Sequence, residues 1–136
     1  MPPSERKPHA MRHDVDRIRD ILKSARSIIE RLRQFTLKTL PDDCIKASFY
    51  DVIVIGEAIR ELVARKEPAG QKITSDAPIV EANPEIPWLD WIGMRDMVTH
   101  QYFRAAPEVI WRDYEIGEFE RLIACCEAWL KDSQPA

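Results

Sequence analysis

The stretch from Met11 to Thr39, MRHDVDRIRDILKSARSIIERLRQFTLKT, decides the fold. Its apolar residues recur every three or four positions, the spacing that places side chains on one face of an α-helix. The apolar seam consists of Val15, Ile18, Leu22, Ala25, Ile29 and Leu32, and it is widened by Ile21, Ile28 and Phe35. A stripe of this width predicts a long helix that packs against two neighbours, as helices of a bundle do.

A second helical block follows Pro41, which ends the first block and suits the first turn of the next. The apolar period predicts a helix over about 42–66. Gly56 lies in the middle of that helix, where glycine is costly, so we expect a close helix crossing there. The segment 67–87 carries four prolines and is predicted to be a connection with one short helix near 77–81.

The last part of the chain adds two more predicted helices, each opened by a proline. Pro87 precedes a helix over about 88–103, and Pro107 opens a fourth helix with apolar positions as far as Leu130. The predicted fold is therefore all-α. We expect a four- to five-helix up-and-down bundle with a long first helix and a proline-rich connection before the third main helix.

Length and composition fit one ordinary domain. The chain has 136 residues, of which 45% are hydrophobic and 32% charged. We expect a helical domain over 12–131 between a flexible N-terminal tail, 1–11, and a C-terminal tail, 132–136. No apolar run approaches the ~20 residues of a membrane span, and the polar N-terminus does not resemble a secretory signal. We therefore expect a cytoplasmic protein with no membrane association.

The common cofactor and metal motifs are missing from the sequence. Its three cysteines show no metal-ligand spacing, and its four glycines form neither of the common glycine-rich phosphate-binding loops. We therefore expect no cofactor and no metal site. The cysteines are interpreted as small apolar residues of the core or surface.

Charge is distributed unevenly along the chain, whose formal net charge is −3. Residues 1–33 contain nine Lys and Arg against five Asp and Glu, whereas residues 105–136 contain three against seven. The net charge argues against indiscriminate binding to polyanions. The basic N-terminal part allows two interpretations, a local phosphate-binding face or an ordinary solvated helix face.

The most informative stretch is 88–103, WLDWIGMRDMVTHQYF. On a helical wheel, Arg95 falls near the middle of the apolar arc. A guanidinium does not lose its proton, so this position requires either acceptors or a water-filled cleft. A polyanionic ligand is one explanation. The other is an internal salt bridge, for example to Glu57 or Asp51 of the second predicted helix.

His100 lies four residues after Asp96, so the two side chains can share one helix face and form a hydrogen bond. A carboxylate beside an imidazole fixes its tautomer and assists proton transfer near neutral pH. The alternative is an ordinary surface histidine.

These residues resemble a known signature. Arg95-Asp96-x3-His100-x-Tyr102 is similar to the R-polar-x3-H-x-Y motif of HEPN ribonucleases, in the branch of HepT-like toxins. Further elements follow in the order and approximate spacing of that family, and the resemblance covers nearly all of residues 12–131. They are VIGEA at 54–58, PEIPW at 84–88, IGMRD at 92–96, HQYF at 100–103 and VIW at 109–111.

The resemblance implies a metal-independent endoribonuclease built as an all-α homodimer, in which two motifs face one cleft. His100 would be the general acid/base when the RNA 2′-hydroxyl attacks the adjacent phosphate. Arg95 would stabilise charge on the phosphorus oxygens, and Asp96 would orient His100 or Arg95. The supporting residues expected around them are Glu57, Thr99 and Arg104.

The resemblance also implies a protein partner. A cognate minimal nucleotidyltransferase, acting as antitoxin, would adenylylate Tyr102 and so block an anionic substrate by volume and by charge. An anchoring role for Tyr102 in the helix is compatible with this. The alternative from a different functional class is a non-catalytic helical subunit. Such a subunit would bind a nucleotide or a nucleotidyltransferase through the same surface and keep Arg95 and His100 for structure.

Overall fold

The computed structural model describes residues 8–63, 76–100 and 106–133, which contain helices and no strand. The elements are α1 (Pro8–Leu32), the short 3-10 helix η2 (Leu37–Thr39), α2 (Asp42–Leu62), α3 (Pro78–Ala82), α4 (Trp88–Thr99), α5 (Ala106–Glu115) and α6 (Glu118–Ser133). The predicted all-α bundle is confirmed. Within the described ranges, no helix combines the length and apolar character needed to cross a membrane.

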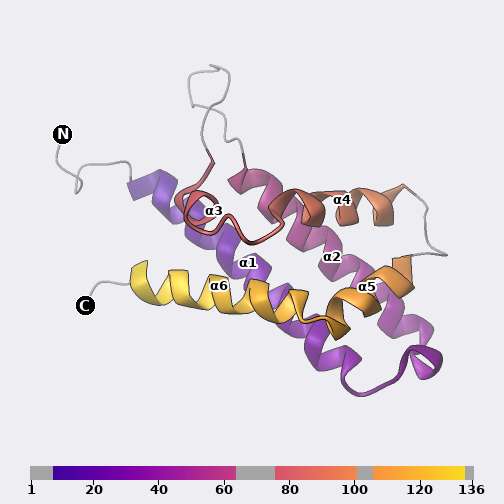
Figure 1. The fold of residues 1–136 in the computed structure, drawn as a ribbon. Coiled ribbons are helices and arrows are strands. Elements are labelled where there is room, and N and C mark those ends of the chain that lie inside the picture. Colours follow the sequence, from indigo (N-terminus) through magenta and orange to yellow (C-terminus); the bar gives the residue numbers. More distant parts are fainter. Residues whose placement is uncertain (1–7, 64–75, 101–105, 134–136) are drawn as a thin grey trace.

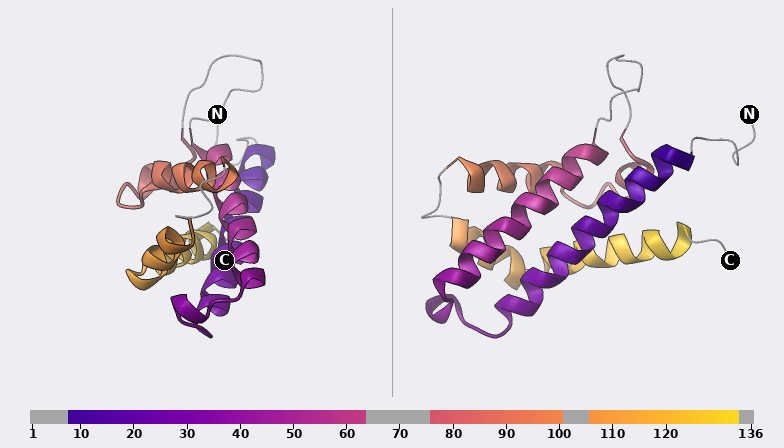
Figure 2. Two further views of the ribbon diagram at one scale, coloured as in Figure 1. Left: turned by 90° about the vertical axis from the view of Figure 1, so that its right-hand side faces the viewer. Right: turned by 180° about the vertical axis from the view of Figure 1, so that it is seen from behind.

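The helices form two layers (Figures 1 and 2). The long helices α1 and α2 run side by side in opposite directions and make up one layer. The other layer contains α4 and the α5–α6 pair, which lie across the first layer. Helix α2 packs against both α1 and α4, while α6 packs against α1. Helix α2 therefore connects the long hairpin to the helix that carries the Arg95–His100 motif.

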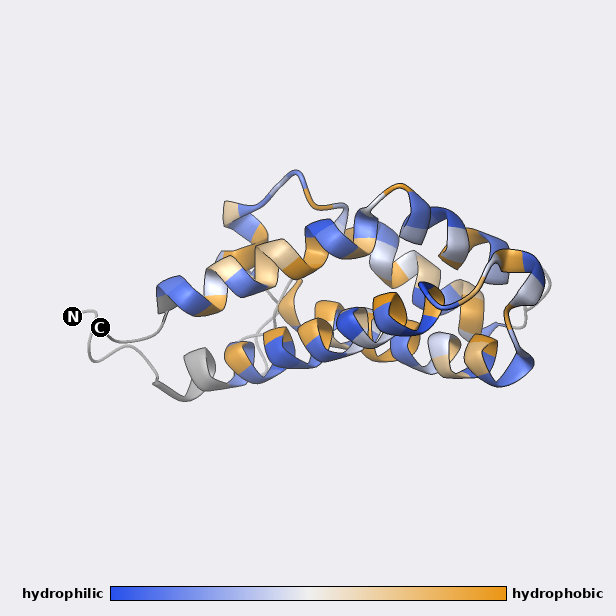
Figure 3. Ribbon diagram, turned by 90° about the horizontal axis from the view of Figure 1, so that it is seen from below, coloured by the Kyte–Doolittle hydropathy of each residue, from blue (hydrophilic) through white to orange (hydrophobic). Residues whose placement is uncertain are grey.

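The core lies between these layers and is built from the apolar face of each main helix (Figure 3). Its largest fully buried side chains are Ile18, Ile21, Ile28, Leu32, Val52, Ile55, Ile59, Leu62, Ile79, Phe119, Leu122 and Cys126. Val15 and Ile29 of the predicted seam are only half-buried. The centre of the buried face of α1 is thus shifted from the predicted seam toward Ile21 and Ile28.

The bounds of α1 differ from the prediction. The helix begins at Pro8, inside the segment 1–11 that was expected to be a tail, because proline is well suited to a first helical turn. It ends at Leu32, so the prediction of helix as far as Thr39 was wrong. The side chain of Thr36 accepts from the Thr39 backbone N–H, and the Thr39 hydroxyl accepts in return from the Thr36 N–H. This reciprocal capping starts a new, short helix in place of the old one.

The predicted close crossing at Gly56 is confirmed. A Cβ atom added there would lie closer to the Cβ of Arg95 than two non-bonded carbon atoms can approach, 2.7 Å from its Cγ and 3.3 Å from the carbonyl oxygen of Trp91. Only a residue without a side chain allows α2 and α4 to approach this closely. The crossing places the base of the Arg95 side chain directly against the backbone of α2.

The fourth predicted helix is two helices, and the expectation of one continuous helix was wrong. The chain breaks between α5 and α6 at Gly117, whose φ of 84° lies in the left-handed region that favours glycine. The sequence signal for this break was Gly117 itself, inside an otherwise regular apolar pattern.

All three cysteines are free. Burial raises the pKa of the Cys125 thiol to about 11 and that of Cys126 to about 12. Such thiols remain protonated near neutral pH and are poor nucleophiles. This agrees with the interpretation of Cys126 as an apolar core residue.

Candidate active site

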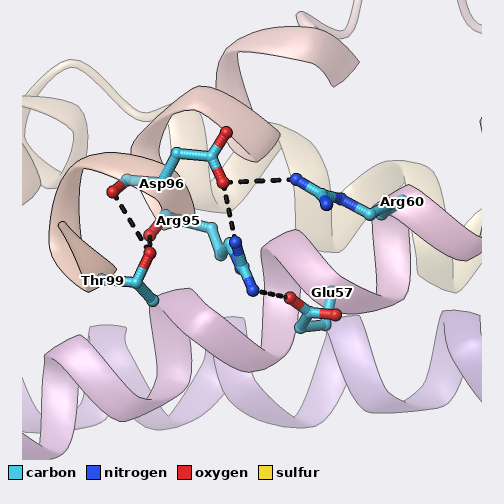
Figure 4. Close-up of polar contacts among 5 residues, drawn as sticks. All are labelled: Glu57, Arg60, Arg95, Asp96 and Thr99. Atoms are coloured by element: carbon cyan, nitrogen blue, oxygen red, sulfur yellow. Dashed lines mark hydrogen bonds and ion pairs between the residues drawn. The ribbon is translucent and has the colours of Figure 1, made fainter.

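The site lies where α4 crosses α2 (Figure 4). Helix α4 supplies Arg95, Asp96 and Thr99, and His100 is the residue that ends it. From the facing side, α2 contributes Glu57 one residue after the glycine of the crossing. The structure therefore brings together the sequence-predicted Arg95, Asp96, Thr99 and Glu57.

Arg95 is held at both ends of its guanidinium. One terminal nitrogen donates to Asp96 Oδ1 at 2.8 Å, and the other forms an ion pair with Glu57. The hydrogen bond to Asp96, with the charges of both carboxylates, raises the pKa of Arg95 above its ordinary value. Of the two internal partners considered from the sequence, the structure selects Glu57, because Asp51 pairs with Arg31 at 2.9 Å instead.

The Arg95 side chain is largely enclosed and only 23% exposed. Its Nε atom is buried and has no hydrogen-bond partner among the residues that the structure describes. Enclosure and pairing together fix the orientation of the guanidinium, which is the preorganisation that electrostatic stabilisation of a phosphate group requires.

Asp96 is the centre of the polar cluster. Its Oδ1 accepts from Arg95 and also from Arg60 of α2, at 3.2 Å. The hydrogen bond from Arg95 holds the pKa of this carboxyl below its usual range, and the charges of Arg60 and His100 act in the same direction. Asp96 is therefore ionised at neutral pH.

His100 does not form the side-chain hydrogen bond with Asp96 that their spacing suggested. Its backbone φ and ψ are −99° and 30°, outside the helix, and its peptide N–H donates to the Asp96 carbonyl oxygen at 3.0 Å. The i,i+4 geometry requires both residues to be helical, and here the helix ends at Thr99. The imidazole is exposed at the helix end.

Thr99 supports the site through the backbone. Its hydroxyl is within hydrogen-bonding distance of the carbonyl oxygens of Arg95, at 3.1 Å, and Asp96, at 3.2 Å. A threonine that bonds to preceding carbonyls satisfies acceptors in the last turn of a helix. Thr99 thus helps to define the end of α4, directly before His100.

Arg60 was missed by the sequence reasoning. It lies three residues after Glu57 and therefore on the same face of α2, which is the signal that could have identified it. Two further predicted residues, Tyr102 and Arg104, lie outside the described residues.

Several cations of the basic N-terminal part form ion pairs. Three arginines of α1 each contact a carboxylate, namely Arg17 with Asp20, Arg26 with Glu127 and Arg31 with Asp51, and Arg33, directly after α1, contacts Glu30. This favours the interpretation of a solvated helix face. Within the described ranges, no three His, Cys, Asp or Glu side chains gather in a group that could hold a metal ion.

Comparison with known proteins places the chain in a family. Residues 18–127 match the family described as ribonuclease HepT-like. A Thermococcus cleftensis protein named "Probable ribonuclease HepT" is 30% identical over 112 residues, covering 76% of this chain and 94% of the relative. A protein of Caldanaerobacter subterraneus subsp. tengcongensis, named as an RNase, is 26% identical over 107 residues, covering 76% of this chain and 84% of the relative. No solved structure matches.

The family match extends from the first helix to the last and includes the whole α2–α4 crossing. It therefore contains every residue of the polar cluster as well as His100. The resemblance read from the Arg95–His100 motif is confirmed, and the chain belongs to the ribonuclease HepT-like family.

Proposed function

We propose that this protein is an endoribonuclease toxin that cleaves RNA by attack of a 2′-hydroxyl, without a metal ion. Family membership supports the enzyme class. The observation that carries the site assignment is the Arg95–Asp96 pair, locked at the α2–α4 crossing one turn before an exposed histidine. A fixed cation beside an accessible acid/base group is the combination that phosphodiester cleavage needs.

In this mechanism His100 accepts the proton of the 2′-hydroxyl as its oxygen forms a bond to the adjacent phosphorus. The bond from phosphorus to the 5′-oxygen breaks, and the leaving oxygen takes up a proton. The products are a 2′,3′-cyclic phosphate and a free 5′-hydroxyl. Arg95 stabilises the charge that develops on the non-bridging oxygens, and Asp96, paired with Arg95, keeps that guanidinium in place.

Each chain provides a single motif histidine, whereas the reaction has one proton to remove and one to deliver. We therefore propose a homodimer in which two motifs share one cleft. In that arrangement His100 of the partner subunit, or a water molecule, protonates the leaving oxygen. The exposed position of His100 at the end of α4 supports this, because a second chain can approach it.

The activity is tested with the purified wild-type protein and single-stranded RNA in the presence of EDTA. We expect cleavage that leaves cyclic phosphate ends, detected by gel electrophoresis and mass spectrometry of the fragments, and growth arrest when the protein is expressed alone in the bacterial cytoplasm. A wild-type protein that cleaves no RNA and is harmless in cells would instead support the non-catalytic nucleotide- or nucleotidyltransferase-binding subunit.

We propose that control of the toxin acts through Tyr102, two residues beyond the exposed His100 in the sequence. A minimal nucleotidyltransferase antitoxin would transfer AMP from ATP to the tyrosine oxygen and release pyrophosphate. An AMP group so near the acid/base residue would exclude RNA by its volume and its negative charge.

Co-expression with a small nucleotidyltransferase of the proposed antitoxin class checks the modification. The intact mass of the wild type is expected to rise by one or more AMP groups, and RNA cleavage is expected to fall to background. Tyr102→Phe removes the acceptor oxygen and should show neither effect, while Tyr50→Phe, an exposed tyrosine on α2, should be modified like the wild type. Unchanged masses throughout would argue against adenylylation.

A further inference from the structure

The two arginines of the polar cluster differ in how much of each remains available to a ligand. The Arg95 side chain is 23% exposed, and both of its terminal nitrogens are engaged with carboxylates. The Arg60 side chain is 51% exposed and contacts the cluster through one nitrogen only. Arg60 forms no other hydrogen bond or ion pair with the described residues. The more accessible guanidinium of this site is therefore that of Arg60 (Figure 4).

The net charge of the polar cluster also points to Arg60. Glu57 and Asp96 supply two negative charges, and Arg95 and Arg60 supply two positive ones, so the cluster as a whole is neutral. A neutral cluster does not attract a polyanion unless one of its cations is able to change partner. Arg95 is enclosed and held by two carboxylates, which leaves Arg60 as the cation that is free to turn.

The contact that holds Arg60 is the weaker one at Asp96. Its nitrogen lies 3.2 Å from an oxygen that already accepts from Arg95 at 2.8 Å. Ion pairs between side chains as exposed as these contribute little to stability. A phosphate can accept two parallel N–H bonds from one guanidinium, whereas Arg60 donates only one to Asp96, so an exchange of Asp96 for phosphate would add a hydrogen bond.

We propose that Arg60 is a substrate-binding residue, whose guanidinium leaves the shared Asp96 oxygen to bind a phosphate group of the RNA strand beside the reacting one. This inference rests on the proposed ribonuclease function. It assigns a role to a residue of α2 that lies outside the Arg95–His100 motif. The two arginines then have different roles, since Arg60 binds the strand while Arg95 is the residue proposed to stabilise the reacting phosphate.

Binding is measured with a single-stranded RNA oligonucleotide that carries 2′-O-methyl groups and is not cleaved. Arg60→Gln is expected to weaken binding about tenfold, because one charge-assisted phosphate contact is lost. The slope of log K against log salt concentration should fall by roughly 0.7, the contribution of one phosphate on a single strand. Arg60→Lys keeps the charge but loses the fork, so its affinity should lie between those of the wild type and Arg60→Gln.

The matched control is Arg121→Gln on α6. Arg121 is similarly exposed, at 59%, and its ion pair is with Glu118 of its own helix, not with a residue of the polar cluster. Its removal is expected to leave RNA affinity, the salt slope and cleavage unchanged. Thermal unfolding of both glutamine variants shows whether either loses the fold.

The kinetics of cleavage of an unmodified RNA distinguish a binding role of Arg60 from a positioning role. A binding role predicts that Arg60→Gln raises KM about tenfold and leaves kcat within about threefold of the wild type. If kcat falls while KM is unchanged, Arg60 acts through Asp96 and the proposal is overturned. It is equally overturned if Arg60→Gln binds RNA as tightly as Arg121→Gln while the wild type cleaves normally. A wild type that does not cleave RNA at all contradicts the ribonuclease function itself.

Discussion

Replacement of His100 by alanine is expected to lower the rate of RNA cleavage by about 100-fold or more and to abolish growth arrest. A positioned general acid/base contributes roughly 10²–10⁴ to a rate, and no other histidine of the chain lies near the Arg95–Asp96 pair in sequence. The fold should be unaffected, because the imidazole is exposed at the end of α4. The contact that ends the helix there is the hydrogen bond from the His100 backbone N–H to the Asp96 carbonyl oxygen, and alanine keeps it. Surface substitutions of this kind change stability by less than about 0.5 kcal/mol.

The measurement compares initial cleavage rates of wild type and variant at equal concentration, with circular dichroism and thermal unfolding as checks of the fold. His13→Ala is the matched control. His13 is half-exposed on α1, its Nε2 lies 3.6 Å from a carboxylate oxygen of Glu61, and its removal should leave cleavage intact. Cleavage by His100→Ala at a rate close to that of the wild type would exclude His100 as the acid/base group. The reaction would then have to be assigned to another residue.

Arg95 shows how far the sequence predicts this site. Arg95 lies in an apolar arc, where burial of its charge is costly unless a polar partner is present. The apolar period of the preceding helix brings Glu57 within reach as that partner. The glycine beside Glu57 predicts a close crossing for a separate reason, the cost of glycine in a helix. Two independent signals therefore lead to the same contact between α2 and α4.

His100 and Arg60 show where such reasoning ends. The spacing of Asp96 and His100 predicts a bond only if the helix continues, and the sequence does not specify that α4 ends at Thr99. Arg60 lies on the correct face of α2, but the contacts of a long exposed side chain depend on how two helices meet. Periodicity establishes which residues are buried, whereas contacts between exposed groups are decided by tertiary packing.

Gly56→Ala is expected to cause the largest loss of stability among single-methyl changes at this site. The added Cβ would clash with the Cβ of Arg95, and neither atom can turn away, because each is bonded directly to a helix backbone. Helix α4 must therefore move away from α2. Overpacking of this kind costs about 1–3 kcal/mol, and the better helix propensity of alanine offsets less than about 1 kcal/mol of it. For a domain of this size, the unfolding temperature should fall by roughly 5 °C.

The same displacement should reduce activity, because it carries Arg95 away from Glu57 and alters the direction of its guanidinium. Gly93→Ala provides the control on α4 itself, since a Cβ at Gly93 meets no atom within 4 Å. That change should stabilise the protein by about 0.5–1 kcal/mol through helix propensity alone and leave cleavage unchanged. Denaturant unfolding and cleavage rates of both variants measure the two effects together. If Gly56→Ala is as stable and active as Gly93→Ala, the close crossing does not hold the site in place, and the preorganisation of Arg95 must arise from its ion pairs.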